Sequence, residues 1–326
     1  MDLVAQIRVS LGTAIIIGLS KGKLDAPSST AYLMTYHDGK CRSNCSFCPQ
    51  AQKSKSNSQY LARIIWPTYS TTNVLDHLTT STEQKKINRI CIQALNYPKV
   101  FSDLKTLIAK IKSRTTLEIS VCCQPQNREI MQQLKNAGAD RLGIALDGAT
   151  PTVFNRVKGN SYRWENQFLL FKEALDVFGR GNISTHLIVG LGETEQETAK
   201  TIQRCVDEGV LPALFAFTPV RGTALENTFA PKVSSYRKLQ LAQHLIVQKK
   251  TKADKFTYNT EGKIIHFGLE NSCLEAIVAS GLPFQTSGCP GCNRPYYNEK
   301  PSGPIYNYPK PPRREEIAKI KEEIFS

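Results

Sequence analysis

From residue 31 onward the chain alternates short apolar runs with longer amphipathic runs, and this alternation limits the fold more than any other feature. The apolar runs predict strands and the amphipathic runs predict helices, which together are typical of repeated βα units around a parallel sheet. The expected strands are 31–36, 87–94, 117–123, 141–146, 184–189 and 213–218, and the expected helices between them include 102–113, 128–137, 164–178 and 193–208.

About six such units favour an α/β fold with a partial or full (β/α) TIM-type barrel. A doubly wound sheet is less suitable, because no G-x-G-x-x-G follows the first expected strand. We predict an N-terminal helix and connector at 1–30, the barrel at 31–270 and a cysteine-containing C-terminal extension at 271–326. Within that extension, Gly, Pro and Tyr become frequent over 281–312, which predicts a loop-rich segment, and 313–325 predicts a final helix.

Hydropathy and charge bear on location and partners. No stretch of about 18 apolar residues occurs, so we expect no membrane span, and the apolar run 11–19 predicts a buried helix. We expect a cytoplasmic protein. The formal net charge of +14 favours acidic partners, but no basic motif interleaved with aromatic residues points to nucleic acid as the leading one.

Three cysteines follow the first expected strand with the spacing C-x-x-x-C-x-x-C: Cys41, Cys45 and Cys48. Three thiolates on one tight loop can bind three corners of a cubane iron–sulfur cluster and leave the fourth iron open. An open metal position is what a catalytic centre needs. Phe47 can cover the cluster or a ligand's base. The alternative is a structural zinc loop that lacks a nearby fourth ligand.

The triplet, with an aromatic residue at Phe47, resembles the signature of the radical S-adenosylmethionine superfamily. The resemblance covers most of residues 31–226 and is closest to biotin synthase, through Cys48-Pro49-Gln50 and the segment 188–193. It implies a [4Fe-4S] cluster on the triplet that chelates S-adenosylmethionine at its open iron. It also implies cleavage of that cosubstrate to a 5′-deoxyadenosyl radical.

The same resemblance implies residues that bind the cosubstrate. Asp147 would accept ribose hydroxyls or contact substrate, although an Asp before Gly also makes turns. The other implied contacts are Phe47, Gly190, Gly192, Glu193 and Val220. His186 stands where the superfamily pattern has a glycine, and Gln93 to Asn96 replace its acidic glycine motif.

A second cysteine group lies in the extension, where Cys289 and Cys292 form a C-x-x-C and Cys273 lies upstream. We predict that Cys273, Cys289 and Cys292 hold an auxiliary iron–sulfur cluster, with a redox dithiol or a zinc knuckle as alternatives. Biotin synthase builds its sulfur-donating cluster inside the barrel, from strand cysteines and an arginine. Cys91 with Cys122 or Cys123 can match that arrangement, or can simply be core residues.

Residues 289–299 and 303–309 resemble the archaeal biotin-synthase-like proteins that act as subunits of a two-component lipoyl synthase. That resemblance implies a sulfurtransferase that acts on an octanoyl-lysine of a lipoyl carrier protein, with a partner lipoyl synthase subunit and a ferredoxin-like electron donor. The first alternative is a biotin synthase-like enzyme for a small molecule such as dethiobiotin. An electron-transfer scaffold and a nucleic-acid-modifying enzyme are the other classes.

The iron content tests the two-cluster prediction. Anaerobically reconstituted protein should hold about eight irons, and Cys289→Ala should lower this to about four, because one cubane loses its ligand set. An iron and sulfide assay measures both values. An unchanged count in the variant would remove the argument for a sulfur donor.

Overall fold

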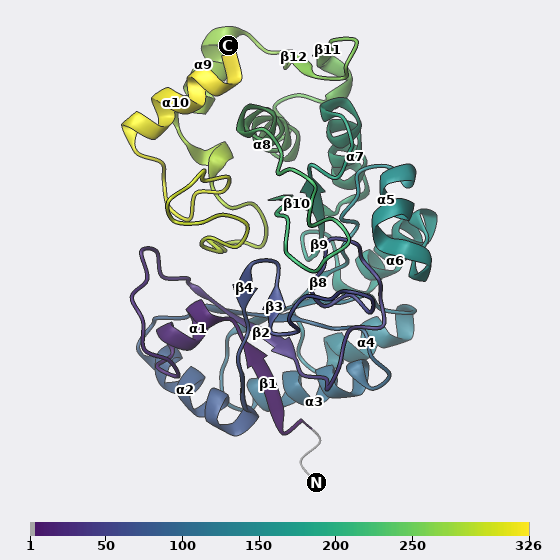
Figure 1. Ribbon diagram of the computed structural model, residues 1–326, viewed down its shortest axis with the longest axis vertical. Helices are drawn as coiled ribbons and strands as arrows, with labels where there is room; N and C mark the ends of the chain where they lie inside the picture. The colour runs from purple at the N-terminus through teal and green to yellow at the C-terminus, as the bar shows by residue number, and fades with distance from the viewer. Residues whose placement is uncertain (1–3, 326) are drawn as a thin grey trace.

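The computed structural model describes residues 4–325, which form one open eight-stranded sheet covered by helices (Figure 1). The strand order is β10-β9-β8-β7-β6-β2-β1-β5. Six of the strands run parallel to one another: β2 (Thr30–Thr35), β6 (Arg89–Gln93), β7 (Glu118–Cys122), β8 (Arg141–Gly143), β9 (Ile183–Val189) and β10 (Leu211–Ala216). The prediction of about six βα units is confirmed, and the barrel is partial because β10 and β5 are free edges.

Helices cover the outer face of the parallel strands. They are α2 (Thr71–Glu83), α3 (Val100–Lys112), α4 (Arg128–Asn136), α5 (Pro151–Lys158), α6 (Trp164–Phe178), α7 (Glu195–Glu208) and α8 (Val233–Val247). In α3 the buried side chains Leu104, Leu107, Ile108 and Ile111 recur at helical spacing. All six residues of β2 are buried, as expected for a parallel strand covered on both faces.

The start of α7 differs slightly from its prediction for a local reason. The expected helix began at residue 193, but Thr194 is the N-cap of a helix that begins at Glu195. The Thr194 side chain accepts the Glu197 N–H, and the Glu197 carboxylate accepts the Thr194 N–H. This capping box satisfies two amides that the first helical turn leaves unpaired.

The N-terminal segment adds to the sheet, which the expectation of a helix and connector at 1–30 did not include. β1 (Gln6–Val9) pairs antiparallel with β2 and with β5 (Thr68–Ser70). The helix predicted over 11–19 follows as α1 (Leu11–Ile16), which is shorter than predicted and is buried only at Thr13 and Ala14. A four-residue strand is too short to show a period. Residues 1–3 of that predicted segment and residue 326 lie outside the described residues.

Two small hairpins complete the strands: β3 (Tyr60–Leu61) with β4 (Ile64–Ile65), and β11 (Thr257–Tyr258) with β12 (Ile264–His266). Short 3-10 helices lie at Gly159–Ser161, Ala253–Lys255 and Leu282–Phe284. None of the helices in residues 4–325 is both long and apolar enough to cross a bilayer.

The C-terminal part is irregular, as predicted. After α9 (Asn271–Ala279), residues 285–308, here called the tail segment, contain no helix and no strand, and α10 (Arg314–Phe325) follows. Figure 1 shows this stretch as a looped coil between the sheet and the pair α9–α10.

The tail segment crosses the open side of the sheet. Near β10, the Leu214 N–H donates to Ser287 Oγ (2.9 Å) and the Thr218 hydroxyl donates to the Asn298 carbonyl (2.7 Å). Next to β2, Asn293 Oδ1 accepts the Ser29 N–H (3.2 Å). The segment therefore joins the two strands on either side of the gap that a complete barrel would close.

A buried arginine on α8 fixes the end of the tail segment. Arg237 is 2% exposed, and its guanidinium donates to the carbonyls of Ile305 and Tyr306 and to Glu323 of α10. These carbonyls lie in irregular backbone, so side chains of α8 satisfy them: Arg237 donates to both, and Gln240 also donates to the Tyr306 carbonyl (2.9 Å).

Replacing Arg237 should destabilise the protein and loosen the tail segment. Arg237→Leu leaves Glu323 and the Ile305 carbonyl without this partner and leaves the Tyr306 carbonyl with Gln240 alone, so the free energy of unfolding should fall by about 3–5 kcal/mol. Urea unfolding measures the loss, and limited proteolysis should show faster cleavage after Lys300. Arg204→Leu is the control, since Arg204 is 43% exposed and its ion pairs contribute at most about 1 kcal/mol. Equal losses in the two variants would contradict this account.

Candidate functional site

A cavity of about 230 Å³ lies inside the open sheet, toward the carboxyl ends of the parallel strands. The loops after β2, β6, β7, β8 and β10 line one part of it, and the tail segment supplies Arg294, Tyr297 and Asn298. In parallel α/β folds these strand ends are where functional loops gather. The predicted cysteine loop therefore lies at the end of the sheet where functional loops gather in such folds.

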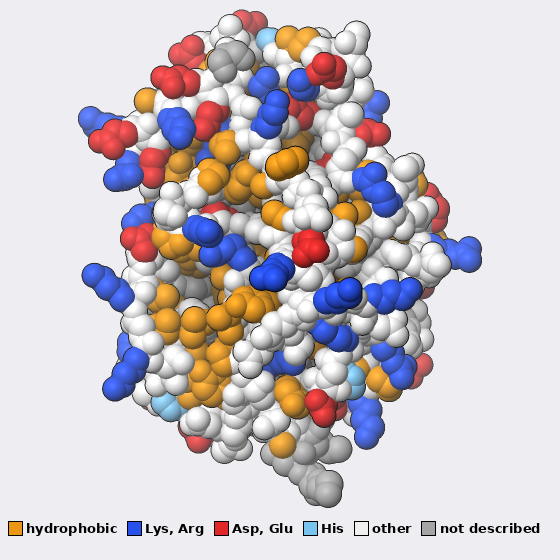
Figure 2. Space-filling view, in the orientation of Figure 1, with side chains coloured by type: hydrophobic (Ala, Val, Ile, Leu, Met, Phe, Trp, Pro, Cys, Tyr) orange, Lys and Arg blue, Asp and Glu red, His pale blue; other side chains and the backbone are white. Residues whose placement is uncertain are grey.

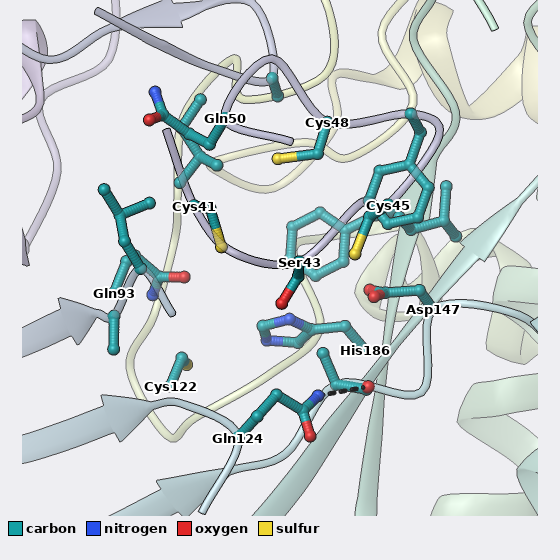
Figure 3. A pocket seen from close by; sticks show the side chains of 18 of the residues that line it. Cys41, Ser43, Cys45, Cys48, Gln50, Gln93, Cys122, Gln124, Asp147 and His186 are labelled. Atoms are coloured by element: carbon teal, nitrogen blue, oxygen red, sulfur yellow. Dashed lines mark hydrogen bonds between the residues drawn. The ribbon is translucent and has the colours of Figure 1, made fainter. Parts of the chain in front are cut away.

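The three cysteines of the triplet line this cavity (Figure 3). Short backbone bonds shape their loop: the Cys48 N–H donates to the Cys45 carbonyl (3.0 Å), and the Cys41 N–H donates to the Gln50 carbonyl (2.9 Å). The Lys40 ammonium holds the loop from outside by donating to the carbonyls of Pro49 (2.7 Å) and Ser56 (2.5 Å). In Figure 3 the three sulfur atoms point into one common space.

The surroundings of these thiols suit a multi-iron cluster. Burial raises the pKa of Cys45 to about 11, which the nearby Lys158 charge only partly opposes, and burial also raises the pKa of Cys48. Such thiols ionise when a metal binds. The Asn96 N–H donates to Cys41 Sγ (3.2 Å), a bond that stabilises a thiolate. Within residues 4–325 no three potential ligands surround a single ion's position, but in a cubane each thiolate binds a different corner.

Beside Cys45 lies a buried ion pair. Lys158, the last residue of α5, donates to Asp147 Oδ2 (2.6 Å), and the two side chains are only 4% and 9% exposed. Burial lowers the pKa of Lys158, but the charges of Asp147 and Cys45 raise it more, so the ammonium stays charged. Asp147 follows β8 with a positive φ of 65°. The Asp147 carboxylate, which was expected to accept ribose hydroxyls or contact substrate, thus already accepts the Lys158 ammonium. The sequence alone did not point to Lys158.

The ion pair is connected to the triplet loop through Tyr162. The Lys158 ammonium lies 5.0 Å from the centre of the Tyr162 ring, and the Tyr162 hydroxyl is 2.5 Å from Ser43 Oγ. The Asn96 side-chain amide donates to both hydroxyls. One polar network thus links Asn96 after β6 and Asp147 after β8 to the loop that carries the cysteines.

The remaining predicted cosubstrate residues divide into two groups. Phe47 lines the cavity and packs against an apolar cluster that contains Val153, Val157, Leu191 and Phe217. Gly190, Gly192, Glu193 and Val220 lie in the turns after β9 and β10, outside the cavity lining.

The turn after β9 has a clear structural basis. Gly190 and Gly192 have φ values of 103° and 112°, and a Cβ on Gly192 would lie 2.5 Å from Arg156 Nη2. Glu193 Oε1 accepts the Gly190 N–H (2.7 Å). Burial raises the pKa of Glu193, against the effect of the backbone N–H groups that it accepts.

His186 lines the cavity from β9, at the position where its family pattern has a glycine. Burial and the positive charge of Arg294 lower the pKa of His186 to about 4. The imidazole is therefore neutral at physiological pH, so it can offer one donor and one acceptor to a bound molecule.

A second set of thiols lies deeper in the sheet. Cys91 of β6 and Cys122 of β7 are hydrogen-bonded neighbours, which together with burial raises the pKa of Cys91. The tail segment brings Cys292 to 3.0 Å from the Tyr32 hydroxyl and Cys289 to 3.4 Å from Ser120 Oγ. Tyr32 and Ser120 are both register partners of Cys91. We call Cys91, Cys122, Cys289 and Cys292 the floor cysteines.

The structure does not bring Cys273 into this group. It is exposed on α9 and does not line the cavity, whereas the predicted auxiliary set placed it with Cys289 and Cys292. Spacing along the chain could not show this, because the two tail cysteines reach the sheet through contacts across more than 160 residues. Cys123 and Cys205 are buried.

Arg294 lines the cavity from the tail segment, a position that the sequence alone did not predict. Its guanidinium carbon lies 4.1 Å from the centre of the Tyr297 ring, 5.0 Å from that of Tyr32 and 5.1 Å from that of Phe215. Its Nε and Nη2 atoms are buried without a hydrogen-bond partner among the described residues. A charged group with unused donors in a cavity is prepared for an anionic or carbonyl ligand.

Comparisons with known proteins find a matching family profile, a related sequence and similar folds. The profile described as "Radical SAM superfamily" matches residues 36–205. A biotin synthase from Chlamydia pneumoniae is 25% identical over 225 residues, which span 67% of this chain and 64% of the relative, less than two thirds of its length.

Two solved structures share the fold. Methylornithine synthase (PylB) superposes with a TM-score of 0.54 at 12% identity, covering 73% of this chain and 67% of that one. The FeFe-hydrogenase maturase HydG from Carboxydothermus hydrogenoformans gives 0.51 at 18% identity, covering 68% and 52%.

The buried ion pair gives a stability prediction. Lys158→Met should lower the free energy of unfolding by about 3–5 kcal/mol, because it leaves the Asp147 carboxylate buried without its cation. The double variant Lys158→Met with Asp147→Asn should recover much of that loss. Urea unfolding of the metal-free protein measures both. Lys112→Met, which removes a more exposed pair with Asp140, should cost at most about 1 kcal/mol. Strictly additive single-variant losses would show that the pair is not coupled.

Proposed function

This chain belongs to the radical S-adenosylmethionine superfamily, and we propose that it is a lipoyl synthase subunit that inserts sulfur into an octanoyl chain on a carrier-protein lysine. Membership implies a [4Fe-4S] cluster and S-adenosylmethionine, and the biotin synthase relative supports a radical enzyme of that kind. The choice of lipoyl formation rests on the arguments that follow.

One observation carries the proposal: a second set of cysteines lies deeper in the sheet than the triplet, and its member Cys122 shares the cavity lining with the triplet. The triplet lies at the strand ends, and Figure 3 shows Cys122 across the cavity from it. Tyr297 lies close enough to both sets that the charges of Cys48, Cys122 and Cys91 each raise its pKa. A reaction that first opens a C–H bond and then forms a C–S bond needs a radical source and a sulfur source within reach of the same carbon.

The residues of the chain would share the work at the triplet. Cys41, Cys45 and Cys48 would hold the cluster, which with S-adenosylmethionine supplies a carbon radical able to take hydrogen from an unactivated C–H bond. Lys158 places a positive charge beside Cys45, and Phe47 offers an apolar wall that excludes water. Neutral His186 adds a hydrogen-bonding group without adding charge.

The floor cysteines would hold the sulfur donor. We propose Cys91, Cys122, Cys289 and Cys292 as the ligands of an auxiliary iron–sulfur cluster, in place of the set that included Cys273. Arg294 supports this assignment, since its positive charge opposes the effect of burial on the pKa of Cys292. A cation near several thiolates offsets their mutual repulsion.

A substrate with an octanoyl chain suits the apolar lining of the cavity. Apolar side chains, among them Leu61, Val100, Phe101 and Phe217, line its walls, as an acyl chain requires. The formal net charge of +14 supports acidic protein partners, which include the carrier and a ferredoxin-like donor. A partner lipoyl synthase subunit remains part of the proposal.

A second candidate is favoured by the unused donors of Arg294. Nε–H and Nη2–H lie on the same edge of a guanidinium and match the two oxygens of a carboxylate. A small acid such as dethiobiotin would offer that carboxylate, whereas an octanoyl-lysine amide offers a single carbonyl oxygen. The biotin synthase relative agrees with this candidate.

A direct competition separates the two candidates. Reconstituted protein is supplied with S-adenosylmethionine, a reductant, and either an octanoylated carrier domain or dethiobiotin, and mass spectrometry follows the substrate and 5′-deoxyadenosine. Gain of sulfur on the carrier supports lipoyl formation, while consumption of dethiobiotin alone supports the second candidate. Absence of 5′-deoxyadenosine with both substrates would rule out both.

Replacing one floor cysteine should separate radical formation from sulfur insertion. Cys91→Ala should still form 5′-deoxyadenosine but lose nearly all sulfur insertion, because the triplet is intact while the sulfur donor is not. Product mass and 5′-deoxyadenosine are measured in the same reaction. Cys205→Ala, a buried core cysteine on α7, and Cys273→Ala should keep both activities. Loss of sulfur insertion in Cys273→Ala would restore the set predicted from spacing.

A further inference from the structure

The loop after β10 carries the most exposed large hydrophobic side chain of residues 4–325. Phe229 is 91% exposed, compared with 65% for Ile265 and 62% for Leu169. The loop runs over 219–232 without a helix or strand and is here called the mouth loop. An exposed aromatic ring on a well-supported loop is a common anchor in protein interfaces.

The mouth loop is held against the loop that bears the cysteine triplet. The Leu225 N–H donates to the Ser46 carbonyl (3.3 Å), and the Gly222 carbonyl accepts the Lys55 N–H (2.7 Å). A Cβ on Gly222, whose φ is 83°, would lie 2.4 Å from the Ser56 nitrogen. Thr218, at the base of the mouth loop, lines the cavity. Phe229 therefore belongs to a loop fixed at the cavity mouth.

Exposed basic side chains belong to both of the loops that are joined here. Lys53 and Lys55 belong to the triplet loop, and Arg221 and Lys232 belong to the mouth loop. We call these four residues the basic collar. None of them forms an ion pair within the described part of the chain. Figure 2 shows Lys and Arg side chains gathered across the middle of the face where these loops lie in Figure 1.

Glu226 is the acidic residue of the mouth loop, and its carboxylate already accepts a hydrogen bond within that loop. The Glu226 carboxylate accepts the Gly222 N–H (2.7 Å), so it stabilises the mouth loop. The collar thus presents unpaired positive charge next to one apolar anchor. Such a surface attracts an acidic partner over several ångströms and then buries the ring on contact.

We propose that the mouth loop and the basic collar form the docking surface for an acidic protein domain that carries the substrate on a lysine arm. Phe229 inserts into an apolar recess of that domain, and the collar pairs with its carboxylates. The identity of the domain as a lipoyl carrier rests on the proposed function. A protein is favoured over RNA because single-stranded RNA is held by several stacking rings, and only Phe229 is offered here.

The test measures binding without turnover. The dissociation constant of reconstituted protein for an octanoylated carrier domain is determined by calorimetry at low and at physiological salt. Phe229→Ser should raise it about tenfold, since an anchor side chain is lost. Lys55→Glu with Arg221→Glu should raise it at least about tenfold at low salt, and less at physiological salt, where charges are screened.

Matched controls lie on another face. Leu169→Ser removes an exposed apolar side chain from α6, and Lys172→Glu with Lys200→Glu reverses two exposed charges on α6 and α7. Both should bind the carrier like the unmodified protein. The mouth-loop and collar variants should also keep the formation of 5′-deoxyadenosine, because none of the changed side chains lines the cavity.

Each outcome decides one proposal. Equal affinities of the variants and the unmodified protein would overturn the docking surface, as would absence of carrier binding by the unmodified protein. Collar-dependent binding of the electron donor or of transfer RNA, in place of the carrier, would also overturn it. Carrier binding that depends on Phe229 and the collar, but without sulfur insertion, would confirm the docking surface and refute lipoyl formation.

Discussion

The gap in the parallel sheet is the constraint on which the rest of the structure depends. Six parallel strands curve around a cavity but do not close, so the concave side between β10 and β2 must be covered by another part of the chain. The tail segment covers it, with side-chain and backbone bonds to Leu214, Thr218 and Ser29. Because the cover is irregular backbone and not another strand, it can bring Arg294 into the cavity and Cys289 and Cys292 next to the strands beneath it.

The cavity contains more charge than a purely structural interior would. Lys158 and Asp147 form a nearly buried pair, whereas Arg294 has aromatic neighbours and unused donors but no carboxylate partner among residues 4–325. Burying an unpaired charge opposes folding, and such costs are typical of sites that receive a charged ligand. The pair fixes the triplet side of the cavity, and the free guanidinium marks the side where an anionic group is expected.

Local features of the sequence predicted the βα order of the fold and the cysteine triplet. The βα pattern and helices such as α6 followed from periodicity, and the triplet followed from a spacing within eight residues. Contacts that depend on the folded backbone could not be inferred this way: Cys292 meets Tyr32 across 260 residues, and Lys158 at the end of α5 meets Asp147, 11 residues before it. Spacing therefore grouped Cys273 with the wrong neighbours, and the basic collar became visible only when the two loops lay together.

The anchoring of the tail segment also affects how the protein is made. Arg294, Cys289 and Cys292 are synthesised long after β1 and β2, yet the two cysteines lie against the sheet to which these strands belong. Contacts so distant along the chain form late in folding. The triplet loop is thus made before the tail segment that covers the cavity, and delivery of iron is best timed to follow synthesis of that segment.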